Sequence, residues 1–232
     1  MNIALLGYGK MGKTIEKIAT ERGHTIVLKV DKNDTTYDVS IADVAIDFSI
    51  PSAAVNNITN CFNAGVPIVS GTTGWLNDYD QMISLCEKKK GGFIYASNYS
   101  LGVNLFFELN KKLAKMMNPV EGYDIQMEEI HHIQKLDAPS GTAITLAEGV
   151  IENSSKNSWK LDTGDNNTIP IIAKRIEDVP GTHIGNYASA VDDIEITHTA
   201  HNRQGFALGA VIAAEWLQGK SGVFGMKDVL GL

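Results

Sequence analysis

The chain has 232 residues, of which 44% are hydrophobic and 20% are charged, and its formal net charge is −7. This composition is typical of a globular protein and lacks the depletion of apolar residues that marks disordered chains. The negative charge argues against nucleic acid or an anionic membrane as a partner, because both call for a basic surface.

The first predicted strand and helix enclose a glycine-rich turn. Residues 2–6 form an apolar run typical of a buried strand, and apolar positions from Met11 onward predict a helix that begins near Lys10. A G-x-G-x-x-G pattern lies between them, made of Gly7, Tyr8, Gly9, Lys10, Met11 and Gly12. Such a turn lets a diphosphate approach the helix N-terminus, so these residues are predicted to bind a dinucleotide. A glycine-rich packing turn is the alternative.

The next predicted strand, residues 25–31, ends in Asp31. An acidic residue at this distance from the glycine turn can accept hydrogen bonds from the adenosine ribose of the cofactor. Asp31 favours NADH, because its carboxylate would repel the 2′-phosphate of NADPH. Lys32 is adjacent and could turn toward that phosphate, so both residues are predicted to contact the cofactor.

Three further strands are predicted over residues 44–49, 67–74 and 93–100, with helices over about 52–64 and 78–89. Alternating strands and helices indicate a parallel sheet, which binds ligands at the carboxyl ends of its strands. The strand ends therefore supply the remaining predicted cofactor contacts, which are Phe48, Ser49, Gly71, Thr72, Thr73, Ala96, Ser97, Asn98 and Tyr99. Ordinary loop chemistry is the alternative interpretation.

The pattern changes after Ser100. Residues 101–117 predict an amphipathic helix with Leu105, Leu109, Leu113 and Met116 on one face. Strands are predicted over residues 122–132, 168–176, 183–191 and 193–201, and the polar residues 152–167 are expected to form a long loop. Consecutive strands after a helix indicate a smaller α+β domain with an antiparallel or mixed sheet. From residue 206 a helical pattern resumes, so the tail could return to the first domain.

A cluster of cations precedes a further predicted helix. The sequence EEIHHIQKLDAPSGTA, residues 128–143, contains His131, His132 and Lys135. Ser140 is a natural N-cap, so the amides that follow it are free donors for an anion. A histidine can supply a proton near neutral pH, as hydride transfer to an anionic acceptor requires. A surface cluster whose charge is cancelled by Glu128 and Glu129 is the alternative.

The remaining signals concern cysteine, metals and location. Cys61 and Cys86 lie in predicted helices without metal-ligand or CxxC spacing, so we expect buried or idle thiols and no metal site. The apolar start is too short for a signal peptide, and no run approaches the length of a membrane span. We therefore expect a cytoplasmic protein without a membrane partner.

Several segments resemble the dihydrodipicolinate reductase family: GYGKMG, GTTGW, ASNYSLGVN, EIHHIQKLDAPSGTA and ITHTAHNRQGFALGA. The resemblance runs in order along nearly the whole chain, and its most specific element is HH-x-x-K-x-DAPSGTA. It implies a doubly wound Rossmann domain and a second domain that forms a homotetramer. It also implies NAD(P)H-dependent reduction of a cyclic dicarboxylate, 4-hydroxy-tetrahydrodipicolinate, to tetrahydrodipicolinate on the diaminopimelate route to lysine.

The resemblance also implies roles for residues and domains. His131 and Lys135 would handle the proton, and the dicarboxylate would bind to His132, Ser140, Gly141 and Thr142. Apart from the resemblance, Arg203 follows the last predicted strand and is a candidate for the second carboxylate, with a surface or interdomain salt bridge as the alternative. Residues 1–100 and 204–232 would form the dinucleotide-binding domain, and residues 101–203 the substrate-binding and oligomerisation domain.

Cofactor choice and two rival functions remain open. Many relatives carry an arginine after the DF-[ST] motif, where this chain has Ile50, so we expect both cofactors to be accepted with NADH favoured. One rival is another Rossmann-fold reductase of a small carboxylated substrate, such as a semialdehyde or homoserine dehydrogenase. The other is a non-catalytic dinucleotide sensor, which would not need His131 and Lys135 together.

Overall fold

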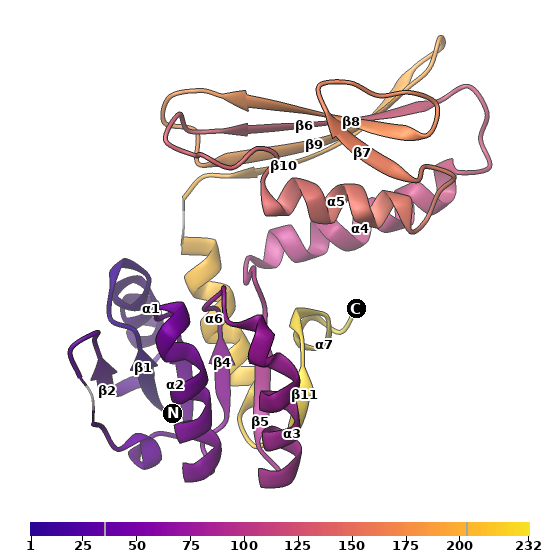
Figure 1. Cartoon of the computed structure of the whole chain (residues 1–232). Helices are drawn as coiled ribbons and strands as arrows, with labels where there is room; N and C mark the ends of the chain where they lie inside the picture. The colour runs from indigo at the N-terminus through magenta and orange to yellow at the C-terminus, as the bar shows by residue number, and fades with distance from the viewer. Residues whose placement is uncertain (35, 203) are drawn as a thin grey trace. The chain divides into compact units, whose positions relative to one another are not determined.

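The computed structural model describes residues 1–34, 36–202 and 204–232. The chain divides into two compact units, Met1–Leu101 with Gln204–Leu232, and Gly102–Arg203 (Figure 1). Each unit has its own sheet and its own hydrophobic core. Among the described residues, no helix is both long enough and apolar enough to cross a membrane.

The first unit is built on a six-stranded sheet in which every pair of neighbouring strands is parallel. The order is β11-β5-β4-β3-β1-β2. The bounds are β1 Asn2–Leu6, β2 Thr25–Val30, β3 Val44–Asp47, β4 Ile68–Ser70, β5 Gly92–Tyr95 and β11 Gly222–Phe224. The chain runs outward from β1 in one direction and from β3 in the other, so the carboxyl ends of β1 and β3 form the switch point where open α/β sheets bind ligands.

Helices cover both faces of this sheet (Figure 1). Their bounds are α1 Lys10–Glu21, α2 Pro51–Ala64, α3 Tyr79–Lys89, α6 Gln204–Leu217 and α7 Met226–Leu230, with short 3-10 turns η1 Val39–Ile41 and η2 Leu76–Asp78. One core cluster joins the sheet to α1 and α6, and a second joins it to α2 and α3. Helices on both faces of a parallel sheet confirm the predicted Rossmann-type fold. Both cysteines are free and buried in the second cluster.

The second unit has a five-stranded mixed sheet in the order β10-β9-β6-β8-β7. The bounds are β6 Asp124–His131, β7 Ser158–Leu161, β8 Thr168–Arg175, β9 Gly181–Ala188 and β10 Asp193–Ala200. Strand β9 is antiparallel to β6 and β10, whereas β8 is parallel to β6 and β7. The predicted mixed sheet is confirmed, but β7 lies in the segment expected to be a loop.

Two helices, α4 Leu101–Met117 and α5 Gly141–Ile151, contribute to the core of the second unit. The predicted apolar stripe of α4 lies mostly outside the core. The structure buries Phe106, Ala114 and Met117, whereas Leu105 and Leu109 are about half exposed. Both stripes have helical spacing, so periodicity alone does not decide between them.

Candidate functional site

The glycine turn between β1 and α1 leaves room for a ligand. Gly7 has φ +99°, and a Cβ there would lie 2.2 Å from the carbonyl oxygen of Phe48. A Cβ on Gly12 would lie 2.3 Å from the carbonyl oxygen of Gly7, so the turn and the helix pack too closely for a side chain. A Cβ built on Gly9, the N-cap of α1, would have no other atom within 4 Å. The open space therefore lies before the helix amides that lack intrahelical partners, and it fits a diphosphate.

A cavity of about 260 Å³ lies beside this turn. Three segments that are distant in the sequence line it, namely Met11, Phe48 with Ser49 and Pro51, and Gly71 with Thr72 and Thr73. The ring of Phe48 packs on Gly71 so closely that a Cβ on that glycine would lie 2.3 Å from it. The structure thus brings six of the predicted cofactor residues to one cavity.

A buried carboxylate that the sequence analysis missed organises these loops. Asp47 is fully buried and accepts hydrogen bonds from Ser49 Oγ at 2.7 Å, Asn57 Nδ2 at 2.8 Å, Ser70 Oγ at 2.9 Å and Thr72 Oγ1 at 2.8 Å. Burial raises the pKa of Asp47, although these donors oppose the rise. The hydroxyls of Ser49 and Thr72 therefore donate to a carboxylate inside the protein, and their contact with a cofactor stays a prediction.

Two tyrosines predicted at the cofactor site have other partners. Tyr99 is 1% exposed and donates to the carbonyl oxygen of Ser70 at 2.8 Å, so its side chain belongs to the core, and its contact with a cofactor stays a prediction. The hydroxyl of Tyr8 donates to Glu16, and the Lys29 ammonium lies 4.9 Å from the centre of the Tyr8 ring. Tyr8 thus joins a surface ion-pair group next to the glycine turn.

The remaining predicted cofactor residues lie at strand ends. Asp31 directly follows β2, and one of its carboxylate oxygens accepts from the amide of Lys32 at 2.7 Å. Both side chains are exposed, as is that of Ile50 before α2. The loop after β5 contains Ala96, Ser97 and Asn98, and the side-chain oxygen of Asn98 accepts from the amide of Ser100 at 2.9 Å.

In the second unit, strand pairing brings an acid and two histidines together. Glu129 and His131 lie two residues apart on β6, so they share one face of the sheet. His183 on β9 is the register partner of Glu129. Glu129 Oε2 lies 3.6 Å from His131 Nδ1 and 3.9 Å from His183 Nε2. All three residues are buried.

The protonation states of this group follow from its partners. Burial alone would raise the pKa of Glu129, but hydrogen bonds from the Ser140 amide at 2.9 Å and from Arg175 at 3.1 Å hold it below its usual value. Burial lowers the pKa of His131 and lowers that of His183 to about 4. Near pH 7 the group therefore consists of a carboxylate and two neutral imidazoles.

Arg175 also holds the loop between β6 and α5. Its Nε donates to the carbonyl oxygen of Lys135 at 3.2 Å, and its Nη2 donates to that of Asp137 at 2.6 Å. The Lys135 ammonium donates to both carboxylate oxygens of Asp137 at 2.8 Å. The predicted proton-handling lysine is therefore fixed at its backbone and paired with an acid at its tip.

The start of α5 has the predicted cap. Ser140 Oγ accepts from the amide of Ala143 at 3.2 Å and lies 3.1 Å from His183 Nε2. Gly141 is exposed, and a Cβ there would meet nothing within 4 Å. An open helix start with unpaired first-turn amides, which Gly141 and Thr142 supply, can bind an anion. Ser140 itself is 3% exposed and its side chain lies in the protein interior, so its contact with substrate stays a prediction.

Two more residues, His132 and Arg203, were predicted to bind substrate. His132 is half-buried and accepts from the amide of Lys135 at 3.1 Å through its backbone carbonyl. Arg203 lies outside the described residues.

The sequence did not single out three residues of this group as parts of the site: Glu129, Arg175 and His183. Glu129 could have been found from the sequence, because it continues the inward-facing alternation of Ile125 and Met127 along the strand.

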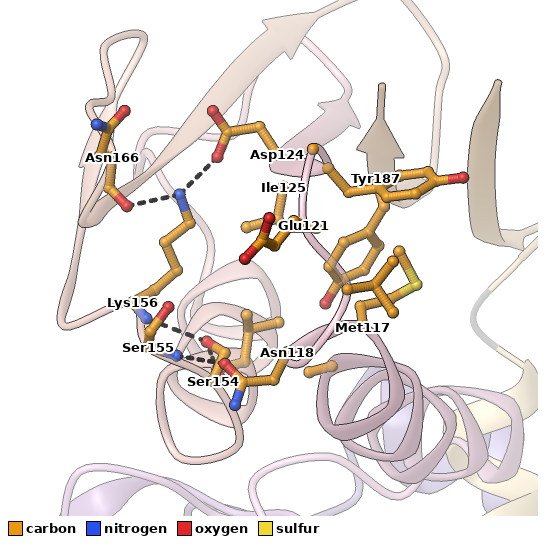
Figure 2. A pocket seen from close by; sticks show the side chains of 15 residues that line it. Met117, Asn118, Glu121, Asp124, Ile125, Ser154, Ser155, Lys156, Asn166 and Tyr187 are labelled. Atoms are coloured by element: carbon orange, nitrogen blue, oxygen red, sulfur yellow. Dashed lines mark hydrogen bonds and ion pairs between the residues drawn. The ribbon is translucent and has the colours of Figure 1, made fainter. Parts of the chain in front are cut away.

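A second cavity, of about 440 Å³, lies elsewhere in the second unit (Figure 2). Its wall includes Tyr187 and Lys156, whose ammonium donates to Asp124 at 2.7 Å and to the carbonyl oxygen of Asn166 at 3.0 Å. Asp124 begins β6 and His131 ends it, and an eight-residue strand is roughly 25 Å long. None of the predicted site residues that the structure describes lines this cavity.

A doubly wound parallel sheet with an open glycine turn, joined to a unit with a buried acid-histidine group beside a capped helix, defines a Rossmann-type oxidoreductase with a separate second domain. Residues 1–99 match the family model of the dihydrodipicolinate reductase N-terminus, and residues 102–230 match that of its C-terminus. The chain therefore belongs to the dihydrodipicolinate reductase family.

Individual relatives agree with this membership. The chain is 60% identical to the 4-hydroxy-tetrahydrodipicolinate reductase of Christiangramia forsetii over 99% of this chain and 98% of the relative. It is 35% identical to that of Neisseria gonorrhoeae over 94% and 84%, respectively. The fold is similar to that of a dipicolinate-bound dihydrodipicolinate reductase from Paenisporosarcina sp. TG-14, with a TM-score of 0.78, 23% identity and 97% of each chain covered. These findings confirm the function and the class of enzyme that the sequence predicts.

Proposed function

We propose that, in the NAD(P)H-dependent reduction of 4-hydroxy-tetrahydrodipicolinate to tetrahydrodipicolinate, His131 and Lys135 supply the proton that accompanies hydride transfer. The observation that carries this proposal is the arrangement at the end of β6. His131 is backed there by the buried Glu129 carboxylate, and Arg175 links that carboxylate to the backbone of Lys135.

The negative charge of the bound substrate would favour the protonated form of His131, which is the form that can donate a proton. Burial lowers the pKa of His131, so its imidazole is neutral in the free protein near pH 7. A bound dicarboxylate adds negative charge, which favours the imidazolium form. Lys135 is paired with Asp137 at 2.8 Å in the free protein, and it exchanges this carboxylate for one of the substrate. Proton supply thus depends on substrate binding.

The start of α5 is the proposed carboxylate site. The amides of Gly141 and Thr142 and the Thr142 hydroxyl bind one carboxylate, and His132 and Lys135 add polarity and charge. The open space at Gly141 supports this assignment. The dipicolinate bound to the reductase from Paenisporosarcina, which has a similar fold, supports a dicarboxylate as the class of substrate. Arg203 is the proposed ligand of the second carboxylate.

The first unit is the proposed dinucleotide-binding domain, made of residues 1–100 and 204–232. NAD(P)H, when bound, supplies the hydride. The glycine turn and the 260 Å³ cavity fit the cofactor, and Asp31 accepts hydrogen bonds from the ribose. The carboxylate of Asp31 and the exposed Ile50 both favour NADH over NADPH.

Residues 101–203 are the proposed substrate-binding and oligomerisation domain of a homotetramer. Strand β10 is an edge of the sheet, and Ile194 on it is 39% exposed. Exposed edge strands and apolar side chains are commonly covered in an assembly. Sedimentation at micromolar concentration should show four chains, and a monomer would contradict the assignment.

We expect the enzyme in the cytoplasm. Its free cysteines are consistent with the reducing conditions there.

Steady-state kinetics test the catalytic roles. His131→Ala and Lys135→Ala should each lower kcat by about 10²- to 10⁴-fold, the usual contribution of a general acid. The exposed His201 and Lys174 provide matched controls, His201→Ala and Lys174→Ala, which should keep wild-type kcat. Thr142→Val should raise KM for the substrate more than it lowers kcat, because a ground-state contact is lost. Wild-type kcat in both catalytic variants would contradict the proposal.

A further inference from the structure

Glu129, His131 and His183, here called the Glu–His–His cluster, are held together by sheet pairing. Glu129 and His131 project from the same face of β6, and His183 stands opposite Glu129 on β9. One possible ligand atom from each side chain lies within 4.8 Å of the other two. The backbone ladder, rather than a mobile loop, therefore sets their separation.

The separations are close to those of a metal site. Zinc bonds to imidazole nitrogen or carboxylate oxygen are about 2.0–2.2 Å long, so two ligands of a tetrahedral ion lie roughly 3.3–3.6 Å apart. Glu129 Oε2 lies 3.6 Å from His131 Nδ1 and 3.9 Å from His183 Nε2. The three ligand atoms lie within 4.8 Å of one another, so side-chain rotations that draw the two histidine nitrogens closer together would bring all three atoms onto one ion.

The donor chemistry agrees with the distances. Two neutral imidazoles and one carboxylate form a common ligand set for zinc that leaves a fourth position open. Within the described residues, His131 Nδ1 is buried and has no hydrogen-bond partner, so this nitrogen lacks the contact that a buried polar atom requires. The Ser140 amide and Arg175 already orient the carboxylate, as outer-shell partners do in metal sites.

We propose that the Glu–His–His cluster is a reversible binding site for a transition-metal dication of the zinc type. The guanidinium of Arg175, 3.1 Å from the other Glu129 oxygen, opposes a second positive charge and makes the site weaker than a structural zinc site. Neither Cys61 nor Cys86 contributes, because both lie in the core of the first unit. The site therefore binds its metal ion without a thiolate ligand, unlike the tightest zinc sites.

Binding of the metal alone tests the proposal. Chelator-treated protein is titrated with ZnCl₂ by calorimetry and with CoCl₂ by visible absorption, where a tetrahedral Co²⁺ ion gives intense bands. We expect one ion per chain. His183→Gln should weaken binding at least tenfold, whereas His201→Gln, at an exposed histidine, should leave it unchanged. No saturable binding, or equal affinity in His183→Gln and the wild type, would overturn the site.

X-ray absorption at the zinc edge on the wild-type complex keeps the test independent of how the variant folds. Two imidazole ligands and one carboxylate are expected, and a shell of oxygen atoms alone would overturn the assignment. Zn²⁺ should also inhibit the reductase, and this effect rests on the proposed role of His131. One-to-one binding at the cluster without inhibition would support the site and contradict that role, so the two failures are distinguishable.

Discussion

Arg175 on β8 and the fully buried Glu129 on β6 meet at 3.1 Å, directly behind the loop that carries Lys135. The same guanidinium donates to the backbone carbonyls of Lys135 and Asp137. One side chain therefore sets both the environment of His131 and the path of the loop, and the two effects can be separated by substitution.

Arg175→Lys keeps a positive charge but lacks the planar group that reaches several acceptors. We expect kcat to fall by about 10- to 100-fold, because even a small misplacement of a catalytic group lowers the rate by this order. Because the charge of Arg175 lowers the pKa of His131, Arg175→Gln should also move the high-pH limb of the kcat/KM profile to higher pH, whereas Arg175→Lys should leave that limb in place. Lys174→Gln, next to Arg175 and half exposed, is the control. A wild-type kcat in Arg175→Lys would exclude the positioning role.

His183 should make the fold sensitive to acid. Its pKa is lowered to about 4, chiefly by burial, whereas in the unfolded chain it lies near 6.5. Between these values the unfolded chain binds more protons, so stability is complete above the unfolded pKa and is lost as pH falls toward the folded one. The contribution of His183 to the free energy of unfolding should decrease by about 3 kcal/mol from pH 7 to pH 4.

Urea unfolding at a series of pH values measures this dependence. His183→Gln should be less stable at pH 7 and should show a shallower loss toward pH 4, and His201→Gln should behave as the wild type. Parallel curves for His183→Gln and the wild type would show that other groups cause the acid sensitivity.

The buried Asp47 should be essential for stability. Asp47→Ala leaves three hydroxyls and a side-chain amide without their acceptor, and buried donors without partners are costly. We expect a loss of about 2–5 kcal/mol in the free energy of unfolding. Asp80→Ala, at an exposed acid in the first turn of α3, should lose less than about 1 kcal/mol. A similar loss in both variants would refute the organising role of Asp47.

Cofactor choice is checked by kcat/KM with NADH and with NADPH. We expect a preference for NADH, because Asp31 repels a 2′-phosphate and Ile50 supplies no cation. Asp31→Ser should shift the ratio toward NADPH by about tenfold, or 1.4 kcal/mol, and Lys32→Ser should reduce activity with NADPH only. A tenfold preference of the wild type for NADPH would show that Lys32 outweighs Asp31.

Local signals predicted the first five strands of the first unit, its helices α1, α2, α3 and α6, and the capped helix α5, but not β11 or α7. The glycine turn and the Ser140 cap each depend on residues close together in the sequence, and the structure has both. The inner face of α4 could not be predicted in this way, because its apolar residues cover more than one stripe. Only packing against β6 and β9 selects Phe106 and Ala114 over Leu105.

Long-range pairing explains most of what the sequence could not show in the candidate site. Glu129, Arg175 and His183 come from three strands, and their meeting depends on the strand order β9-β6-β8. A sequence predicts strands but not which strands pair. Glu129 could still have been singled out, since an acid at an inward strand position requires a partner.

The return of the chain to its first unit affects the order of folding during synthesis. Helix α6 and strand β11 are made after the whole second unit, yet α6 supplies Ala210, Val211 and Leu217 to the core cluster on one face of the sheet. A ribosome that has released only residues 1–101 thus presents a sheet with part of one apolar face uncovered. The second unit, Gly102–Arg203, is contiguous and can close its own core first. Until residues 204–232 emerge, the nascent first unit is exposed to chaperones and to aggregation, although most of it is made before the second unit.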